Sequence, residues 1–441
     1  MSSKRATSVA PLAGPLVGRG SVPGDKSISH RAVLFGAMAE GTSRLEGVLD
    51  SADVRSSIGA VRALGARVSL EKQPDGSLAG EVEGWGAKGP STPAAPIDCG
   101  NSGTTTRLLM GLLAPWDVEA ELVGDESLSR RPMGRITGPL SRMGARFSPE
   151  GRQTLPLTVR GCGAAKPLAY ESPVASAQLK TAILLAGIFA EGETRVDEPA
   201  PSRNHTELML PGYGVRVGSG PGWASVAGPQ SMRACDVRVP GDPSSSAFPV
   251  CAAVMRPGSD LVIEGISLNP ARTGYIDVLR ALGADVEVVE RGKTGEEPVG
   301  DVRARYTACL SATEVAAGAI AGMVDEIPVL ALVASRAEGE TVFYGVSELR
   351  VKETDRLQAV IDGLAVLGVR AWADGDDLHI EGRPGAEVPE GLVFDSLGDH
   401  RLAMTWALVG MTGVVPVEVI DYECVRISYP TFQDDMERFT R

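Results

Sequence analysis

One phrase occurs twice in this chain of 441 residues, at positions almost half a chain length apart. VPGD begins at Val22 and again at Val239. Both copies lead into an apolar stretch and then into a similar segment, VRALGARV from Val61 and LRALGADV from Leu279. Self-similarity of this kind predicts two related halves, each large enough to form a domain with its own core.

A shorter repeat lies inside the halves and consists of an apolar helical pattern, a glycine and a strand-like segment. The apolar residues Leu357, Val360, Ile361 and Leu364 recur at helical spacing, and Gly368 follows where a left-handed helix cap is typical. Similar units end at Gly65, Gly144, Gly214 and Gly283. The spacing predicts three units in each half, with the sixth cut short by the C-terminus. Because one such unit cannot bury its own apolar face, the units must pack around a shared core, in an α/β fold.

Composition and charge limit the partners that this chain can have. Its net charge of −13 argues against a nucleic-acid surface or an anionic membrane, since either requires a basic face. The longest apolar stretches, such as TAILLAGIFA from Thr181, are too short to span a bilayer. The N-terminus has no apolar segment typical of a secretory leader. We therefore expect a soluble, cytoplasmic protein that meets anionic ligands with a local cluster of cations.

The six cysteines and four histidines are isolated from one another along the chain. No pair has the spacing of a metal site or a redox motif, so single thiols in a reducing compartment are expected. The sequence thus predicts neither a metal site nor a disulfide framework.

Residues suited to chemistry lie in polar joints rich in Gly, Ser and Thr, outside the repeating framework. Lys26 and Ser27 stand at a predicted helix start, with Arg31 about one turn further on. Backbone amides, helix dipole and cations together favour a phosphate or carboxylate there. At Asn101–Arg107 a second joint opens an apolar helix, and Gly103 would let a ligand approach the backbone. An ordinary capped helix with surface lysines explains either joint equally well.

Three further joints in the first half carry cations or cap-like residues. Ser129-Arg130-Arg131-Pro132 holds two arginines in a segment that the proline biases towards extended structure, and arginine suits bidentate contact with oxyanions. The segments Ser176–Lys180 and Ser202–Glu207 also resemble helix starts. A solvated arginine pair and two plain caps are the alternatives.

The second half has a denser cluster. Six charges occupy nine positions between Glu348 and Arg356, just where an amphipathic helix begins. Lys352 and Arg356 are four positions apart and Glu353 and Arg356 are three apart, which places all three near one helix face. Asp325-Glu326 and Asp399-His400-Arg401 each precede an apolar run. A solvated helix end is one explanation; a cleft lined by helix N-termini is the other.

In this order, the polar segments resemble those of one family, the 5-enolpyruvylshikimate-3-phosphate (EPSP) synthases. The segments are PGDKS, NSGTTTR, RRPM, SAQLK, SRNHTE, DEIPVLAL, LRVKETDR and DHRLAM, and they cover almost the whole chain. Each is unspecific alone, whereas the ordered series is specific. The SAQLK and RNHTE forms are similar to the class II branch of the family.

The resemblance implies a fold and a reaction. The fold would be a two-domain inside-out α/β barrel, each domain built from three βαβαββ repeats around buried parallel helices, with a cleft between the domains. Residues 25–240 would form one domain, and residues 1–24 plus 241–441 the other. The enzyme would transfer the enolpyruvyl group of phosphoenolpyruvate to the 5-hydroxyl of shikimate 3-phosphate and release phosphate, a step of the shikimate pathway to chorismate and the aromatic amino acids.

The resemblance also implies site residues. Asp325, Glu353 and Lys26 would be catalytic. Shikimate 3-phosphate would be held by Lys26, Ser27, Arg31, Ser176, Ala177, Gln178, Arg203, Asp325 and Lys352. Phosphoenolpyruvate would be held by Lys26, Gly103, Arg131, Gln178, Arg356 and Arg401. No cofactor is implied, and we expect a monomer whose partners are these two anionic substrates.

Two other functions and one departure from the family pattern bear on this interpretation. The related transferase acting on UDP-N-acetylglucosamine usually carries a reactive cysteine before the arginine matching Arg131, and residues 108–130 contain none. A non-catalytic sensor of phosphorylated metabolites would need the cations but not Asp325 and Glu353. Some family members have a lysine near the C-terminus where this chain has Ile427.

Overall fold

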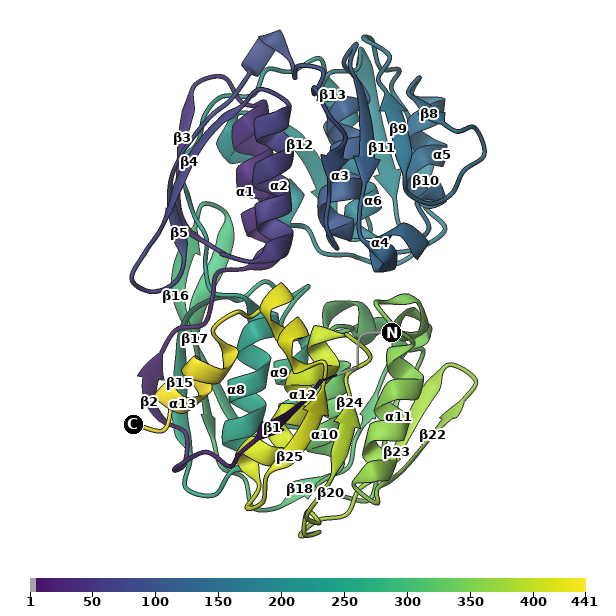
Figure 1. The fold of residues 1–441 in the computed structure, drawn as a ribbon. Helices are drawn as coiled ribbons and strands as arrows, with labels where there is room; N and C mark the ends of the chain where they lie inside the picture. The colour runs from purple at the N-terminus through teal and green to yellow at the C-terminus, as the bar shows by residue number, and fades with distance from the viewer. Residues whose placement is uncertain (1–4) are drawn as a thin grey trace. The chain divides into compact units, whose positions relative to one another are not determined.

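The structure, a computed structural model, describes residues 5–441 and divides into two compact units (Figure 1). Unit 1 comprises the described part of Met1–Pro23 together with Pro240–Gly292 and Pro298–Arg441. Unit 2 comprises Gly24–Val239 and Lys293–Glu297. The chain therefore leaves unit 1 at the first VPGD phrase and returns to it at the second. Residues 1–4 of the expected second domain lie outside the described part.

Unit 2 contains three four-stranded sheets of the same design. Their orders are β14-β3-β5-β4, β6-β7-β9-β8 and β10-β11-β13-β12. In each sheet the first pair of strands is parallel and the remaining pairs are antiparallel. The strands are β3 (Thr42–Val48), β4 (Arg67–Lys72), β5 (Leu78–Glu83), β6 (Ile97–Asp98), β7 (Glu119–Val123), β8 (Arg146–Ser148), β9 (Leu157–Arg160), β10 (Ala169–Glu171), β11 (Gly192–Asp197), β12 (Val217–Gly220), β13 (Trp223–Gly228) and β14 (Val237–Arg238).

Unit 1 repeats this design with strands from both ends of the chain. Its sheets have the orders β16-β17-β15-β2, β19-β21-β23-β22 and β1-β25-β24, with a separate pair β18-β20. The strands are β1 (Ala6–Val9), β2 (Val17–Gly20), β15 (Asp260–Ser267), β16 (Asp285–Thr294), β17 (Glu297–Arg305), β18 (Leu310–Ser311), β19 (Glu314–Val315), β20 (Ala337–Glu338), β21 (Glu340–Phe343), β22 (Arg370–Asp374), β23 (Asp377–Glu381), β24 (Val393–Asp395) and β25 (Val417–Ile420). Two N-terminal strands thus complete sheets formed mainly from the second half.

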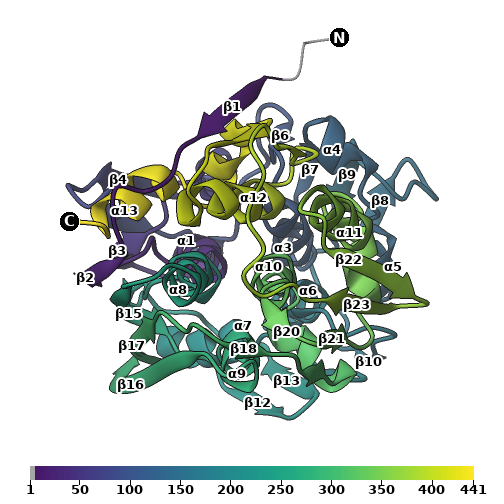
Figure 2. The same ribbon diagram turned by 90° about the horizontal axis from the view of Figure 1, so that it is seen from below.

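Each unit has three inner helices that are mostly or entirely buried. In unit 1 they are α8 (Pro243–Met255), α10 (Ile327–Ala334) and α12 (His400–Thr412), and every residue of all three is buried. Their counterparts in unit 2 are α1 (Lys26–Met38), α3 (Gly103–Leu113) and α6 (Ala177–Gly187). A helix that is apolar all round belongs in an interior. Figure 2 shows α8, α10 and α12 nearly end-on, with the sheets of unit 1 around them.

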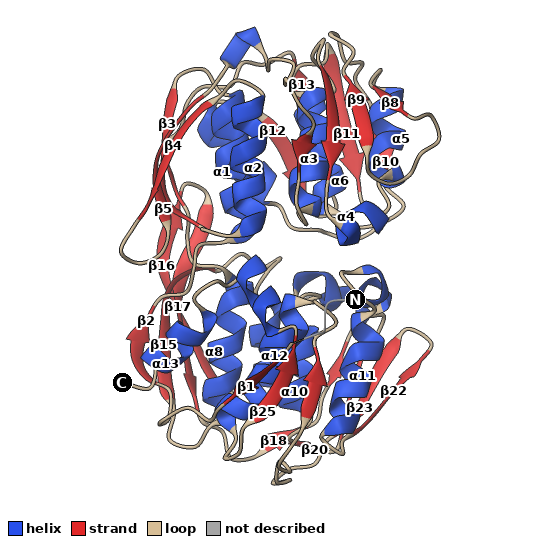
Figure 3. Ribbon diagram, in the orientation of Figure 1, coloured by secondary structure: helices blue, strands red, loops and turns tan. Residues whose placement is uncertain are grey.

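The remaining helices lie beside this inner set in each unit (Figure 3). They are α2 (Ala52–Ala63), α4 (Glu126–Arg130), α5 (Gly134–Arg142), α7 (His205–Met209), α9 (Gly274–Ala281), α11 (Arg356–Val366) and α13 (Phe432–Arg438), with 3₁₀ turns η1 (Gly86–Lys88), η2 (Leu210–Tyr213), η3 (Ala317–Gly322), η4 (Ser347–Val351) and η5 (Tyr422–Ile427). Each unit has its own hydrophobic core. Within the described part, no helix has the length and hydropathy needed to cross a membrane.

The predicted helix caps are confirmed. Gly65, Gly144, Gly214, Gly283 and Gly368 all have positive φ, between 68° and 113°. In each case the residue after the glycine donates its N–H to the carbonyl five positions earlier, as Ala284 does to Leu279 and Val369 to Leu364. This pairing defines the Schellman motif, which ends a helix and directs the chain into the next strand. The repeat seen in the sequence is therefore a repeat of helix ends.

The starts of the inner helices are also fixed by side chains. Asp25, Ser102 and Ser176 cap α1, α3 and α6, each accepting a bond from a backbone N–H of the first turn. In unit 1, Asp242 and Asp399 do the same for α8 and α12. The polar joints at residues 26–31, 101–107, 176–180 and 399–401 stand at these helix starts, where backbone N–H groups and the helix dipole favour anions.

Candidate active site

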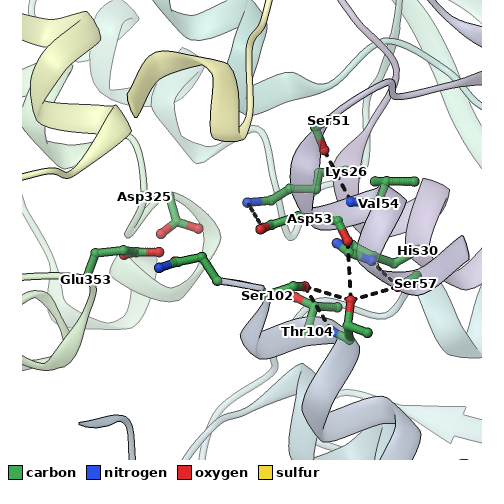
Figure 4. Close-up of polar contacts among 12 residues, drawn as sticks. Lys26, His30, Ser51, Asp53, Val54, Ser57, Ser102, Thr104, Asp325 and Glu353 are labelled. Atoms are coloured by element: carbon green, nitrogen blue, oxygen red, sulfur yellow. Dashed lines mark hydrogen bonds and ion pairs between the residues drawn. The ribbon is translucent and has the colours of Figure 1, made fainter. Parts of the chain in front are cut away.

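Lys26 is the first residue of α1, and its ammonium lies beside a carboxylate of the next helix. Lys26 Nζ is 3.3 Å from Oδ2 of Asp53, which belongs to the first turn of α2 (Figure 4). The two side chains are 21% and 10% exposed, so the pair is accessible from solvent at the lysine end. Sequence reasoning did not find Asp53, although Ser51, which caps α2, marks another polar helix start.

Behind Lys26, buried hydroxyls join three helices of unit 2. His30 Nδ1 is 2.8 Å from Ser57 Oγ, which is 2.8 Å from Thr105 Oγ1. The Thr105 hydroxyl donates in turn to Ser102 Oγ at 2.8 Å (Figure 4). Burial, and then the nearby cations Lys26 and Arg31, lower the pKa of His30 well below its ordinary value. A neutral imidazole therefore links the helix that carries Lys26 to the cap of α3.

Arg31 is buried and connects α1 to the third repeat of unit 2. Its Nε donates to Thr206 Oγ1 at 2.8 Å and its Nη2 donates to Thr181 Oγ1 at 3.0 Å. Its Nη1 donates to the carbonyl of Ser27 at 3.0 Å. The guanidinium is thus held in place by protein groups of three helix starts, and Ser27 is half-buried beside it.

Gly103 begins α3, and two arginines lie against it. A Cβ placed on Gly103 would be 2.6 Å from Arg107 Nη1 and 3.5 Å from Arg131 Nη1. Arg131 Nη2 donates to Asn101 Oδ1 at 2.7 Å, and Arg131 has the extended backbone expected before a proline. The missing side chain of Gly103 therefore makes room for cations at the helix start.

Gln178 is oriented by partners from the Asn101–Arg107 joint. Its Oε1 accepts from Arg107 Nη1 at 2.8 Å, and its Nε2 donates to Thr104 Oγ1 at 2.9 Å. Arg107 is the last residue of the Asn101–Arg107 joint, and the sequence alone gave it no role. Its position one turn after Gly103 on a helix was the available signal, because residues four apart share a helix face.

The start of α6 brings Ser176, Ala177 and Gln178 together. Ser176 Oγ accepts from the N–H of Leu179, and the Ser176 N–H donates to Glu198 Oε1 at 2.8 Å. Arg203 is half-buried in the segment that leads into α7. Apart from Arg31, which lies in the second turn of α1, the residues expected in unit 2 lie at helix starts or in the segments that lead into them.

In unit 1, three carboxylates surround the guanidinium of Arg356, the first residue of α11. Arg356 Nε donates to Asp399 Oδ2 at 2.7 Å, Nη1 to Asp325 Oδ1 at 3.0 Å and Nη2 to Glu353 Oε2 at 2.7 Å. Burial lowers the pKa of Arg356, but the charges of Asp399, Glu353 and Asp325 outweigh burial and raise it above its ordinary value. The guanidinium is 1% exposed, whereas Asp325 and Glu353 are 17% and 26% exposed. Figure 4 shows Asp325 and Glu353 next to each other.

Lys352 and Arg401 each pair with a carboxylate of the segment before α10. Lys352 Nζ is 3.7 Å from Asp325 Oδ1, and Arg401 Nη1 is 3.4 Å from Glu326 Oε1. Ile427, which stands where some family members have a lysine, is half-buried at the end of η5 and carries no charge.

One sequence argument about this cluster was wrong. We expected Lys352, Glu353 and Arg356 to share a helix face, but α11 begins only at Arg356. Asp355 caps the helix by accepting from the N–H of Gln358, so Lys352 and Glu353 precede it in irregular backbone. Glu353 still reaches Arg356, because the turn before the cap folds the chain back.

Comparison with known proteins agrees with the geometry. Residues 12–436 match the family model of EPSP synthase (3-phosphoshikimate 1-carboxyvinyltransferase). A 3-phosphoshikimate 1-carboxyvinyltransferase of Novosphingobium aromaticivorans is 46% identical over 438 residues, covering 97% of this chain and 98% of that protein. That of Parvibaculum lavamentivorans is 46% identical over 424 residues, covering 95% and 93%.

Solved structures give the same result. EPSP synthase of Acinetobacter baumannii is 38% identical with a TM-score of 0.87, over 99% of this chain and 98% of that chain. The enolpyruvyl transferase NikO of Streptomyces tendae, 19% identical with a TM-score of 0.76 over 99% and 98%, shares the fold.

The fold, three sheets around inner helices in each of two units, is that of the enolpyruvyl transferases, and the expected fold class is confirmed. The chain belongs to the EPSP synthase family. It transfers the enolpyruvyl group of phosphoenolpyruvate to the 5-hydroxyl of shikimate 3-phosphate and releases phosphate, in aromatic amino acid biosynthesis. The alternatives of a UDP-N-acetylglucosamine transferase and a sensor are not supported.

Proposed function

We propose that Glu353, Asp325 and Lys26 carry out the proton transfers of this reaction. Protonation of the methylene carbon of phosphoenolpyruvate makes the adjacent carbon electrophilic, and the 5-hydroxyl then attacks that carbon. The tetrahedral intermediate loses phosphate as a proton leaves the same methyl carbon. Glu353 gives and later removes the carbon-bound proton, Asp325 accepts the hydroxyl proton, and Lys26 lies beside the transferring oxygen.

The observation that carries this assignment is the arrangement of carboxylates around Arg356. One buried guanidinium binds both Asp325 and Glu353, at 3.0 and 2.7 Å, while both carboxylates remain partly exposed. A buried arginine with a rigid fork fixes the two carboxylates relative to each other. Two oriented, solvent-accessible carboxylates are what a reaction with two separate proton transfers needs.

We assign the other residues by the charge of the substrates. Both substrates are polyanions, and a chain of net charge −13 has to bind them with local cations. Shikimate 3-phosphate is assigned to Lys26, Ser27, Arg31, Ser176, Ala177, Gln178, Arg203, Asp325 and Lys352. Phosphoenolpyruvate is assigned to Lys26, Gly103, Arg131, Gln178, Arg356 and Arg401. Units 2 and 1 then correspond to the two domains expected from the sequence, residues 25–240 and residues 1–24 plus 241–441, except that Lys293–Glu297 belongs to unit 2. We expect the protein to be a cytoplasmic monomer.

Phosphate release from the two substrates tests the acid–base assignment. Glu353→Gln keeps the size of the side chain but removes its titrating proton, so kcat should fall by roughly 10²-fold or more while substrate affinity changes far less. Asp325→Asn should behave similarly. The matched control is Glu348→Gln, which removes a half-buried carboxylate of η4 outside the proposed site. A kcat of Glu353→Gln within a few fold of the unmodified enzyme would exclude Glu353 as the acid.

A further inference from the structure

A buried ion triad in unit 2 has no role in the assignments above. Lys180 Nζ lies 2.8 Å from Glu198 Oε2 and 2.8 Å from Glu207 Oε1. The three side chains are 4%, 1% and 4% exposed. Lys180 belongs to α6, Glu198 directly follows β11, and Glu207 belongs to α7. One ammonium therefore joins three consecutive elements of the third repeat.

Stability alone is a poor explanation for this triad. Taking charges out of water is costly, and apolar side chains of similar volume often replace buried ion pairs without loss of stability. Here two buried carboxylates share one ammonium. Glu207 Oε2 is buried and has no hydrogen-bond partner among the described residues. An arrangement that contributes so little to stability is better explained by a role in positioning the groups next to it.

Glu198 holds two groups at the start of α6 and before α7. Its Oε1 accepts from the backbone N–H of Ser176 at 2.8 Å, and its Oε2 accepts from the hydroxyl of Ser202 at 2.8 Å. Ser176 is the cap of α6, and Ser202 is the neighbour of Arg203. Hydrogen bonds to a charged carboxylate are short and strong, so Glu198 fixes the positions of both the Ser176 N–H and the Ser202 hydroxyl.

Glu207 and Lys180 stand next to the residues that hold Arg31. Thr181 Oγ1 and Thr206 Oγ1 are 2.6 Å apart, and both accept from the guanidinium of Arg31. The pairs Lys180–Glu207 and Thr181–Thr206 therefore join α6 to α7 by adjacent residues on each helix. The triad thus supports Ser176 and Ala177, the segment that carries Arg203, and the partners of Arg31.

We propose that Lys180, Glu198 and Glu207 are positioning residues that act on the affinity for shikimate 3-phosphate more than on that for phosphoenolpyruvate. Gln178, which stands at the same helix start and is assigned to both substrates, is oriented by Arg107 and Thr104 and not by the triad. This inference rests on the proposed function, because it uses the assignment of Ser176, Ala177, Arg203 and Arg31 to shikimate 3-phosphate. Within the described part of the chain, the side chain of Arg131 bonds to Asn101 and Ser127 and that of Arg401 pairs with Glu326, and none of these belongs to the triad.

The decisive variant is Glu198→Gln, measured in the full-length enzyme. It keeps the shape of the side chain but replaces one charged acceptor with an amide that points a donor at Lys180 and Ser202. Calorimetric titration should show a Kd for shikimate 3-phosphate raised by about 10- to 100-fold. The KM for phosphoenolpyruvate at saturating shikimate 3-phosphate, and kcat, should stay within a few fold.

Glu207→Gln is the second variant and keeps the enzyme testable if Glu198→Gln does not fold. It leaves Lys180 and Glu198 as a balanced pair, so a smaller rise in the same Kd is expected. The matched control is Asp197→Asn, which removes the carboxylate next to Glu198 from a half-exposed pair with Arg195. This control should leave both substrates unaffected.

Two outcomes would overturn the proposal. The first is an unchanged Kd for shikimate 3-phosphate in both folded variants, with only a lower melting temperature, which would show that the triad is structural. The second is an equal rise in the constants for both substrates. Arg203→Ala separates this result from a failure of the proposed function, because an unchanged Kd in that variant would refute the ligand assignment itself, whatever the triad does.

Discussion

At the residue scale, Gly103 stands where any side chain would meet two cations. An alanine Cβ would lie 2.6 Å from Arg107 Nη1 and 3.5 Å from Arg131 Nη1, and the first of these contacts is too close to be kept. The end of the Arg107 side chain is flexible and can shift, so the helix should still form. The space beside the proposed phosphoenolpyruvate site would nevertheless be smaller.

Glyphosate is a slightly longer anion than phosphoenolpyruvate. Gly103→Ala should therefore weaken the binding of glyphosate more than the binding of phosphoenolpyruvate. We expect the glyphosate inhibition constant to rise by about tenfold or more, and the KM for phosphoenolpyruvate to rise much less, because the loss of room for one atom is worth about this much in a tight pocket. Steady-state inhibition kinetics of the two enzymes measure both constants. Equal increases would mean that Gly103 does not distinguish the two ligands.

His30 makes the stability of the protein depend on pH. Burial, followed by Lys26 and Arg31, lowers its pKa well below the ordinary value of 6.5. Below about pH 6.5 the unfolded chain therefore binds a proton at this histidine that the folded chain does not bind. The contribution of His30 to the free energy of unfolding is fully present above this pH and is lost as the pH falls. His30→Gln removes the titration. Between pH 7.5 and 5.5, the variant should lose about 1 kcal/mol less unfolding free energy than the unmodified protein, as measured by urea denaturation. The same pH dependence in both proteins would contradict this assignment.

The sequence provided candidate site residues but not the protein groups that bond to them. Asp25, Ser102 and Asp399 could be found because a cap bonds a backbone N–H two or three residues away, which is a local pattern. The pairs Lys26–Asp53 and Arg107–Gln178 join residues 27 and 71 positions apart. No spacing rule reaches that far, so these pairs needed the folded structure.

At the scale of elements, helix ends were predicted better than strands. Glycine in the left-handed region is a strong local signal, and all five predicted caps have it. The strands β6 and β14 have only two residues each and pair through parallel bridges with β7 and β3. An alternating pattern needs at least four residues to be recognised, so such strands leave no trace in the sequence.

Two glycines of unit 2 should respond to alanine with opposite signs. Gly214 caps η2 with φ of 80°, and a Cβ there would contact nothing within 4 Å. Its replacement should destabilise the protein by about 1 kcal/mol through backbone strain alone. Gly59 is solvent-exposed in the middle of α2, and a Cβ there would also contact nothing within 4 Å. Gly59→Ala should therefore stabilise the protein by about 0.5–1 kcal/mol. Urea denaturation of both variants measures the two effects, and shifts of the same sign would refute the capping argument.

At the scale of the whole molecule, the duplicated phrase marks where the chain passes between the two units. Each unit has a separate hydrophobic core and its own inner helices. The sequence placed residues 1–24 with the second half, and unit 1 likewise contains the described part of Met1–Pro23, but the pairing of β1 with β25 and of β2 with β15 could not be read from it, since the paired residues are more than 200 positions apart. Two separate cores give the chain two units that can unfold one after the other.

Calorimetry of the full-length protein should accordingly resolve two transitions without ligand. Trp406 is buried in the core of unit 1 and stacks on Phe394, so Trp406→Phe should lower the transition temperature of unit 1 alone and thereby assign that transition.

Most residues assigned to shikimate 3-phosphate belong to unit 2. At a hundred times its Kd, this ligand stabilises what it binds by about 2.7 kcal/mol, which should raise the transition of unit 2 by about 5–10 °C. A single ligand-free transition whose calorimetric and van't Hoff enthalpies agree would show that the two cores unfold as one.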